Sequence, residues 1–179
     1  MPIDPSIALS LPIEPTDHVQ GDPGAPYTLV WYGDYECDYC GRAFPLVKEL
    51  QKELGDRLQL VYRHFPVASI HPHAATAAQA AEAAAAQGKF WPMHDLLFEH
   101  QDHLADTDLS QYALRAGVEI YKFNADLSSQ RFAARVKRDH DSGVASGVKG
   151  TPTFFINGYK YTGRPDVTSL AAALSEVAR

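Results

Sequence analysis

The chain has 179 residues, of which 45% are hydrophobic and 21% are charged, enough for one globular domain with a sizeable core or for one domain with a large insertion. The formal net charge is −6 and the lysines and arginines are scattered, which argues against a nucleic-acid partner. No apolar run approaches the roughly 20 residues that span a bilayer, so the sequence predicts a soluble protein without membrane insertion.

Residues 1–24 are expected to form an N-terminal extension. Residues 1–18 contain no lysine or arginine and are interrupted by four prolines, so they provide neither the basic start nor the apolar run of a signal peptide. The sequence as written therefore predicts a cytoplasmic protein. A chain that had already lost its signal peptide would read in the same way and would be periplasmic or extracytoplasmic.

The next residues predict a strand, a helix and a second strand. Residues 27–32, YTLVWY, are β-branched and aromatic and follow a turn-forming stretch, as is typical of a buried strand. A helix is expected to begin at Cys37, to bend at Pro45 and to end at Gly55. Residues 58–63 predict the second strand, and this order favours a right-handed βαβ unit with parallel pairing.

Residues 71–146 are expected to be mostly helical. The alanine-rich stretch at 74–86 is interrupted by polar residues at helical spacing, which favours a packed helix over a low-complexity segment. Further helices are expected in residues 108–117 and 128–140. The bulky residues of 90–98 are interpreted as the core of this block, with an apolar peptide groove as the alternative.

The strand pattern returns after Gly147. Residues 153–157 predict a strand that turns at Asn157-Gly158 into a second strand at 159–163, and a helix is expected over 166–178. The order of elements is therefore βαβ, an all-helical insertion, and ββα.

The only two cysteines form the CxxC motif Cys37-Asp-Tyr-Cys40 between the first strand and its helix. Because metal sites and structural pairs share this motif, it is weak evidence alone. Together with Pro45, Thr151-Pro152 ahead of the late strand and the intervening helical block, it resembles the DsbA-like branch of the thioredoxin superfamily. The resemblance covers residues from about 25 to the end.

This resemblance implies an α/β protein with a thioredoxin fold, βαβ…ββα, and an all-helical insertion between its halves. Residues 25–66 and 147–179 would form the thioredoxin-like domain, and residues 67–146 would form the insertion. In thioredoxin-like proteins the matching proline is cis and faces the cysteine pair, and the preceding residue pairs with the substrate. Thr151 and Pro152 are therefore the implied substrate-binding residues, joined by a cis bond.

The position of the cysteines predicts their separate roles. The first backbone N–H groups of a helix lack partners, and the helix dipole favours an anion there. Cys37, on the exposed first turn, is therefore predicted to be the nucleophile with a lowered pKa. Cys40, one turn further along, is predicted to close the disulfide and to resolve mixed disulfides.

Two departures from the family concern the groups that tune the thiols. Many relatives have a buried carboxylate six residues before the first cysteine, where this chain has Trp31. The nearest acids are Asp34 and Glu36, and Glu36 is either a tuning residue or a solvated one. Strongly oxidising relatives have a histidine between the cysteines, whereas this chain has Asp38 and Tyr39.

These residues predict an intermediate redox potential. Tyr39 can donate a hydrogen bond to a thiolate but brings no positive charge. Asp38 brings a negative charge, which disfavours the thiolate. We therefore expect a potential more reducing than about −150 mV and less reducing than about −270 mV.

Three histidines, His64, His71 and His73, lie between the second strand and the helical block, where they either line a groove or serve as capping and packing residues.

The sequence predicts a protein thiol-disulfide oxidoreductase without cofactor or metal. It would exchange disulfides with cysteines of protein or peptide substrates and would need a separate redox-recycling partner. The alternatives are a non-catalytic peptide-binding module of the same fold, a glutathione-linked oxidoreductase and a metal-binding protein. Zinc normally takes four ligands, and the chain has no second CxxC.

Overall fold

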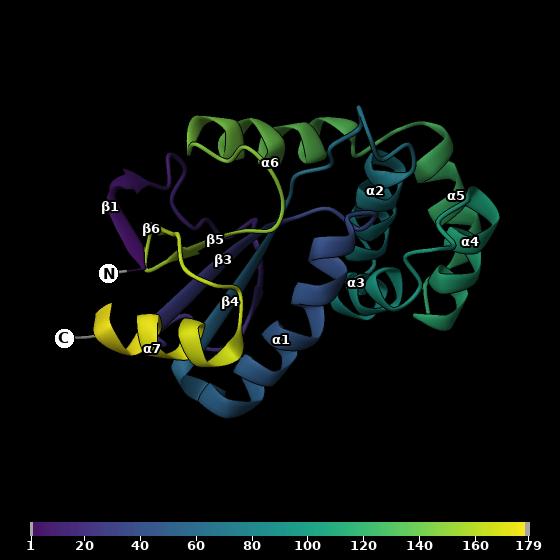
Figure 1. The fold of residues 1–179 in the computed structure, drawn as a ribbon. Helices are drawn as coiled ribbons and strands as arrows, with labels where there is room; N and C mark the ends of the chain where they lie inside the picture. Colours follow the sequence, from purple (N-terminus) through teal and green to yellow (C-terminus); the bar gives the residue numbers. More distant parts are fainter. Residues whose placement is uncertain (1, 178–179) are drawn as a thin grey trace. The chain divides into compact units, whose positions relative to one another are not determined.

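The computed structural model describes residues 2–177, which form two compact units (Figure 1). The first unit contains the chain up to Gly33, the segment Arg42–Arg63 and the chain from Asp141 onward. The second contains Asp34–Gly41 and His64–His140. The cysteine motif thus belongs to the mainly helical unit, while the Thr-Pro pair belongs to the unit that carries the sheet.

A six-stranded sheet organises the first unit, in the order β1-β6-β5-β3-β4-β2 (Figure 1). The strands are β1 (Ile3–Ala8), β2 (His18–Gln20), β3 (Tyr27–Gly33), β4 (Leu58–His64), β5 (Thr153–Ile156) and β6 (Tyr159–Tyr161). In the centre, β3 pairs antiparallel with β5, so that Val30 lies opposite Phe155. The apolar run of β3 is buried, as its composition predicted, because a central strand is covered on both faces.

The two outermost strands, β1 and β2, lie within residues 1–24, and the sequence analysis did not predict them. β1 pairs antiparallel with β6, and β2 pairs antiparallel with β4. Pro5 falls inside β1, where an edge strand tolerates the missing backbone donor. This N-terminal segment is therefore part of the sheet.

Helix α1 follows β3 in the chain, and helix α7 follows β6. Helix α1 spans Asp38–Leu54 and so starts one residue later than expected, whereas its end before Gly55 agrees with the prediction. Gly55 has a φ of 52°, a conformation that glycine adopts readily after a helix. Helix α7 spans Val167–Val177 and contacts β5. Residue 178, the expected end of this helix, lies outside the described residues.

The helices of the second unit are α2 (Ala74–Ala85), α3 (Phe90–Glu99), α4 (Asp106–Arg115), α5 (Ile120–Ser128) and α6 (Ala133–Ala145), the last of which continues into the first unit. Helix α2 contacts α3, α4 and α5. Its alanines are largely buried, so the alanine-rich stretch is the packed helix that the sequence predicted. Phe90, Met93, Leu97 and Phe98 of α3 are also buried and form the expected core.

The sequence pattern predicts no helix at α5, which is therefore an addition to the expected helices.

Within residues 2–177, no helix is both long enough and apolar enough to cross a membrane.

Candidate redox site

Cys37 lies at the N-terminus of α1. Its carbonyl accepts a hydrogen bond from the backbone N–H of Gly41 at 3.0 Å, as in the first turn of a helix, although the helix itself begins at Asp38. Cys37 is therefore the N-cap residue. At the N-cap position, a polar side chain lies near the first backbone N–H groups of the helix, which have no partner within the helix.

Both cysteines are buried, with exposed fractions of 5% for Cys37 and 0% for Cys40. The sequence analysis placed Cys37 on an exposed turn, and this expectation is wrong. A helix N-terminus is exposed only where no other part of the folded chain covers it, and the position in the sequence does not indicate such cover. Cys40, one turn further into α1, has the deeper position that its predicted role requires.

Gln101 makes hydrogen bonds to the backbone at the start of the cysteine motif. Its side-chain Nε2 donates hydrogen bonds to the carbonyl oxygens of Tyr35 and Cys37, each at 2.9 Å. Gly41 leaves room for this side chain, because a Cβ at that position would lie 1.8 Å from Gln101 Oε1. The sequence analysis missed Gln101, since it lies far from the motif in the chain and no pattern marks it.

Replacing Gly41 with alanine should therefore displace Gln101 and release the two carbonyls. We expect a loss of about 1–3 kcal/mol of unfolding free energy, because two partly buried hydrogen bonds are affected. Urea unfolding would measure this loss. Gln101→Ala provides the matched control: in that background Gly41→Ala should cost much less, and an equal cost in both backgrounds would contradict the contact.

Asp34 is a buried carboxylate, 2% exposed, that organises the loop before Cys37. Its Oδ1 accepts the backbone N–H of Glu36 at 2.8 Å, and its Oδ2 accepts the backbone N–H of Val67 at 2.9 Å. The same Oδ2 lies 2.7 Å from Nδ1 of His71. The backbone carbonyl of Asp34 also accepts the N–H of Cys37 at 3.2 Å, so Asp34 connects the loop, His71 and the backbone of Cys37.

His71 is about one-fifth exposed and forms an ion pair with Asp34 when it is protonated. Partial burial disfavours its imidazolium, but the hydrogen bond to Asp34 and the negative charges of Asp34, Cys37 and Glu36 outweigh burial and raise the pKa of His71. The sequence analysis considered Asp34 only as a nearby acid and His71 only as a groove or packing residue. Nothing in the sequence indicates that the two are paired.

Glu36 pairs with His73. Its Oε1 lies 2.9 Å from Nδ1 of His73, and its Oε2 accepts the backbone N–H of the same residue at 2.7 Å. His73 is the residue before α2 and is half exposed, so Glu36 helps to fix the start of that helix. This contact gives Glu36 a structural function, while its role in tuning the thiols stays a prediction.

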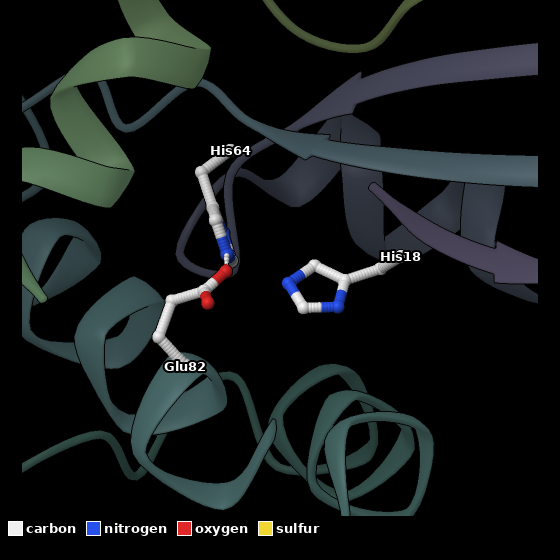
Figure 2. Close-up of side chains that lie close together, drawn as sticks. All are labelled: His18, His64 and Glu82. Atoms are coloured by element: carbon white, nitrogen blue, oxygen red, sulfur yellow. Dashed lines mark hydrogen bonds and ion pairs between the residues drawn. The ribbon is translucent and has the colours of Figure 1, made fainter. Parts of the chain in front are cut away.

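His64 also pairs with a carboxylate. Its Nε2 lies 2.8 Å from Oε1 of Glu82 on α2, and both side chains are buried (Figure 2). The backbone N–H of His64 donates to Asp139 at 3.0 Å. Thus each of the three histidines that the sequence analysis singled out has an acidic partner.

The two residues between the cysteines are exposed to solvent, and Tyr39 has an exposed fraction of 67%. Exposure screens the charge of Asp38, which weakens the opposition to a thiolate that the sequence analysis assigned to it. Trp31, where many relatives have a carboxylate, is fully buried and packs against Tyr62 and Phe154.

Thr151 and Pro152 lie in the first unit, immediately before β5. The peptide bond between them is cis, the isomer that the family resemblance implies. Both residues are partly buried. Their contact with a substrate stays a prediction.

Comparisons with solved structures identify the architecture. A thioredoxin-like oxidoreductase from Silicibacter pomeroyi is 27% identical, with a TM-score of 0.81 over 92% of this chain and 93% of that chain. BdbD from Bacillus subtilis is 23% identical, with a TM-score of 0.79 over 89% and 91%. The thiol-disulfide exchange protein alpha-DsbA2 from Wolbachia pipientis is 19% identical, with a TM-score of 0.78 over 92% and 88%.

Curated relatives are longer proteins. The Na(+)/H(+) antiporter NhaA 3 of Salinispora tropica is 46% identical over 169 residues, and NhaA 1 of Salinispora arenicola is 45% identical over 170 residues. Each match covers 94% of this chain, but the chain spans only 26% of the length of either relative.

A family model described as thioredoxin matches residues 14–176. With the 27% identical structure from Silicibacter pomeroyi, this match confirms the resemblance to the thioredoxin superfamily and the thioredoxin fold that the sequence predicted. The chain belongs to the thioredoxin family.

Proposed function

We propose that the chain is a protein thiol-disulfide oxidoreductase that works through Cys37 and Cys40. The observation that carries this proposal is the position of the pair: Cys37 is the N-cap of α1, and Cys40 follows one turn later and is fully buried. A thiolate is stabilised at the first position, and the second thiol is held within the same turn. The names of the oxidoreductase from Silicibacter pomeroyi and the exchange protein from Wolbachia pipientis support this activity.

In the oxidising direction, a substrate thiolate attacks Sγ of Cys37 in the disulfide form, and the sulfur of Cys40 leaves. A second substrate thiol then attacks the substrate sulfur of the mixed disulfide and releases Cys37. The substrate loses two electrons and two protons, and the cysteine pair gains them. A recycling partner must then remove these two electrons. In the reducing direction the same steps run backwards.

The substrates would be cysteine-containing proteins or peptides, with Thr151 and Pro152 forming part of the binding surface. The compartment follows from the direction of exchange. Disulfides persist in oxidising compartments such as the periplasm, so an oxidant would work there, whereas a reductant would work in the cytoplasm. The potential of the pair against glutathione would decide between these directions.

Selective alkylation tests the assigned roles. Reduced protein treated with iodoacetamide near neutral pH should be modified at Cys37 well before Cys40, because the N-cap position favours the thiolate and Cys40 is completely buried. Peptide mapping by mass spectrometry would give the two rates. In urea the rates should converge, which serves as the control. Equal rates in the folded protein would count against an attacking and a resolving thiol.

Zinc addition during alkylation, a metal assay and a peptide-binding measurement separate two of the alternatives. A metal-binding protein would lose alkylation at both cysteines when zinc is added, and a metal assay on protein purified under reducing conditions would detect the ion. A non-catalytic peptide-binding module would bind peptides equally well with the cysteines oxidised or reduced.

A further inference from the structure

We propose that His71 supplies the positive charge that stabilises the thiolate of Cys37 and thereby shifts the redox balance of the pair. The inference rests on the proposed function. It makes His71 a positioning and charge-tuning residue on a segment remote from the cysteine motif, between β4 and α2.

Asp34 makes hydrogen bonds to both His71 and Cys37. Through its side chain it holds Nδ1 of His71 at 2.7 Å, and through its backbone carbonyl it accepts the N–H of Cys37 at 3.2 Å. Because Asp34 is buried and makes further bonds to Glu36 and Val67, it cannot turn away without breaking several contacts. The imidazole is therefore fixed on the loop that carries Cys37.

The charges around His71 favour its protonated form. Asp34 faces it directly, and Glu36 and Cys37 contribute further negative charge. Glu36 has its own partner in His73, which is half exposed and therefore more strongly screened by solvent. The exposed Asp38 is screened for the same reason. His71 is thus the less exposed of the two histidines, and the charge of Cys37 contributes to its raised pKa.

The interaction between His71 and Cys37 must act in both directions. If a thiolate at Cys37 raises the pKa of His71, a protonated His71 favours that thiolate by the same free energy. When the disulfide forms, the thiolate disappears and His71 should lose this contribution. Titration of His71 is therefore expected to depend on the redox state of the pair.

The balanced reaction shows where the protons go. Two molecules of glutathione thiol reduce the disulfide and leave as glutathione disulfide, transferring two electrons and two protons. Cys40 takes one proton as a thiol, and His71 takes the other in place of Cys37. The dithiol form is thus stored as a thiolate–imidazolium pair, which makes the disulfide form more oxidising.

Nuclear magnetic resonance of the wild-type protein tests the inference without a variant. The Cε1 proton of His71 should titrate at a higher pH in the reduced protein than in the oxidised protein. Identical titration of His71 in the two redox states would overturn the inference.

His71→Asn gives a second test, because asparagine can still donate a hydrogen bond to Asp34 but carries no charge. The thiolate absorbance of Cys37 near 240 nm should appear at higher pH, with a roughly tenfold smaller thiolate-to-thiol ratio at a fixed pH. The equilibrium constant for reduction of the disulfide by glutathione should fall by up to about tenfold. This fall corresponds to a potential about 30 mV more reducing. His73→Asn is the matched control and should change both values much less.

These outcomes distinguish the inference from the function on which it rests. If wild-type protein exchanges with glutathione but His71→Asn changes neither measurement, the function stands and the role of His71 is refuted. An equal effect of His73→Asn would also refute it. If wild-type protein does not exchange with glutathione, dithiothreitol or a disulfide peptide, the proposed function fails, while the thiolate titration of Cys37 still decides the role of His71.

Discussion

Replacing Cys37 with serine should reduce disulfide exchange to the uncatalysed rate. The serine hydroxyl forms no disulfide and stays protonated at neutral pH, and the remaining thiol, that of Cys40, is completely buried. Cys40→Ser should behave differently, since Cys37 could still attack a substrate disulfide but no second thiol would release the product. Turnover of a fluorescent disulfide peptide would measure the first effect, and non-reducing electrophoresis would show mixed disulfides only with the second variant.

The two variants control for each other. Both replace one sulfur with oxygen in a buried position, so a general loss of folding would affect them alike. Dithiothreitol should reduce the mixed disulfides of Cys40→Ser and release the substrate. Trapped substrate in Cys37→Ser instead would reverse the assigned roles, and trapping in neither variant would leave the peptide-binding module as the better explanation.

The central strands and the flanking helices could be predicted from the sequence because their signals are local. The run of residues 27–32 is apolar throughout, and Gly55 marks the end of α1. The short edge strands β1 and β2 have no comparable signal, since their pairing depends on partners far along the chain. Helix α5 was also missed. Its sequence IYKFNADLS contains weak helix formers, and its start is stabilised by Glu119, whose side chain accepts the N–H groups of Tyr121 and Lys122.

The same distinction applies to the site. Cys37 and Cys40 are close in the sequence, so the motif and its relation to the helix could be recognised. The contacts of Asp34 with His71 and of Gln101 with the backbone of Cys37 join segments more than thirty residues apart, as the hydrogen bonds show. No periodicity encodes such pairs, and only the folded chain reveals them. The burial of Cys37 is likewise a property of the folded chain that its neighbours in the sequence do not indicate.

The buried ion pair between Arg63 and Asp17 explains how the N-terminal segment is attached to the sheet. Nε and Nη2 of Arg63 donate to the two carboxylate oxygens of Asp17 at 2.9 and 2.8 Å. Its remaining hydrogen bonds go to the backbone carbonyls of Leu11 and Pro12 and to the hydroxyl of Tyr32. Both charged side chains are almost completely buried.

Burial alone would disfavour the guanidinium. The hydrogen bonds and charge of Asp17, together with Tyr32, outweigh it and raise the pKa of Arg63 above its ordinary value. The guanidinium therefore remains charged inside the protein. The partners of the guanidinium all belong to the first unit, and three of them, Leu11, Pro12 and Asp17, lie in the N-terminal segment between β1 and β2.

Replacing Asp17 with alanine should destabilise the protein by about 3–5 kcal/mol, because it leaves the buried guanidinium without its counter-charge. Arg63→Met should cost a similar amount, since it leaves the carboxylate of Asp17 without its counter-charge and removes the hydrogen bonds of the guanidinium to the carbonyls of Leu11 and Pro12. Urea unfolding, followed by circular dichroism and by tryptophan fluorescence, would measure both. The N-terminal segment should become sensitive to proteolysis in either variant.

The double variant Asp17→Ala/Arg63→Met should be less destabilised than the sum of the single changes, because neither charge is then left buried alone. Arg57→Ala is the control for removing an arginine. Its side chain is exposed and makes one long hydrogen bond to Leu54, at 3.4 Å, so its loss should cost no more than about 0.5 kcal/mol. If the single and double changes were strictly additive, or if Asp17→Ala cost no more than this control, the ion pair would not be what holds the N-terminal segment to the sheet.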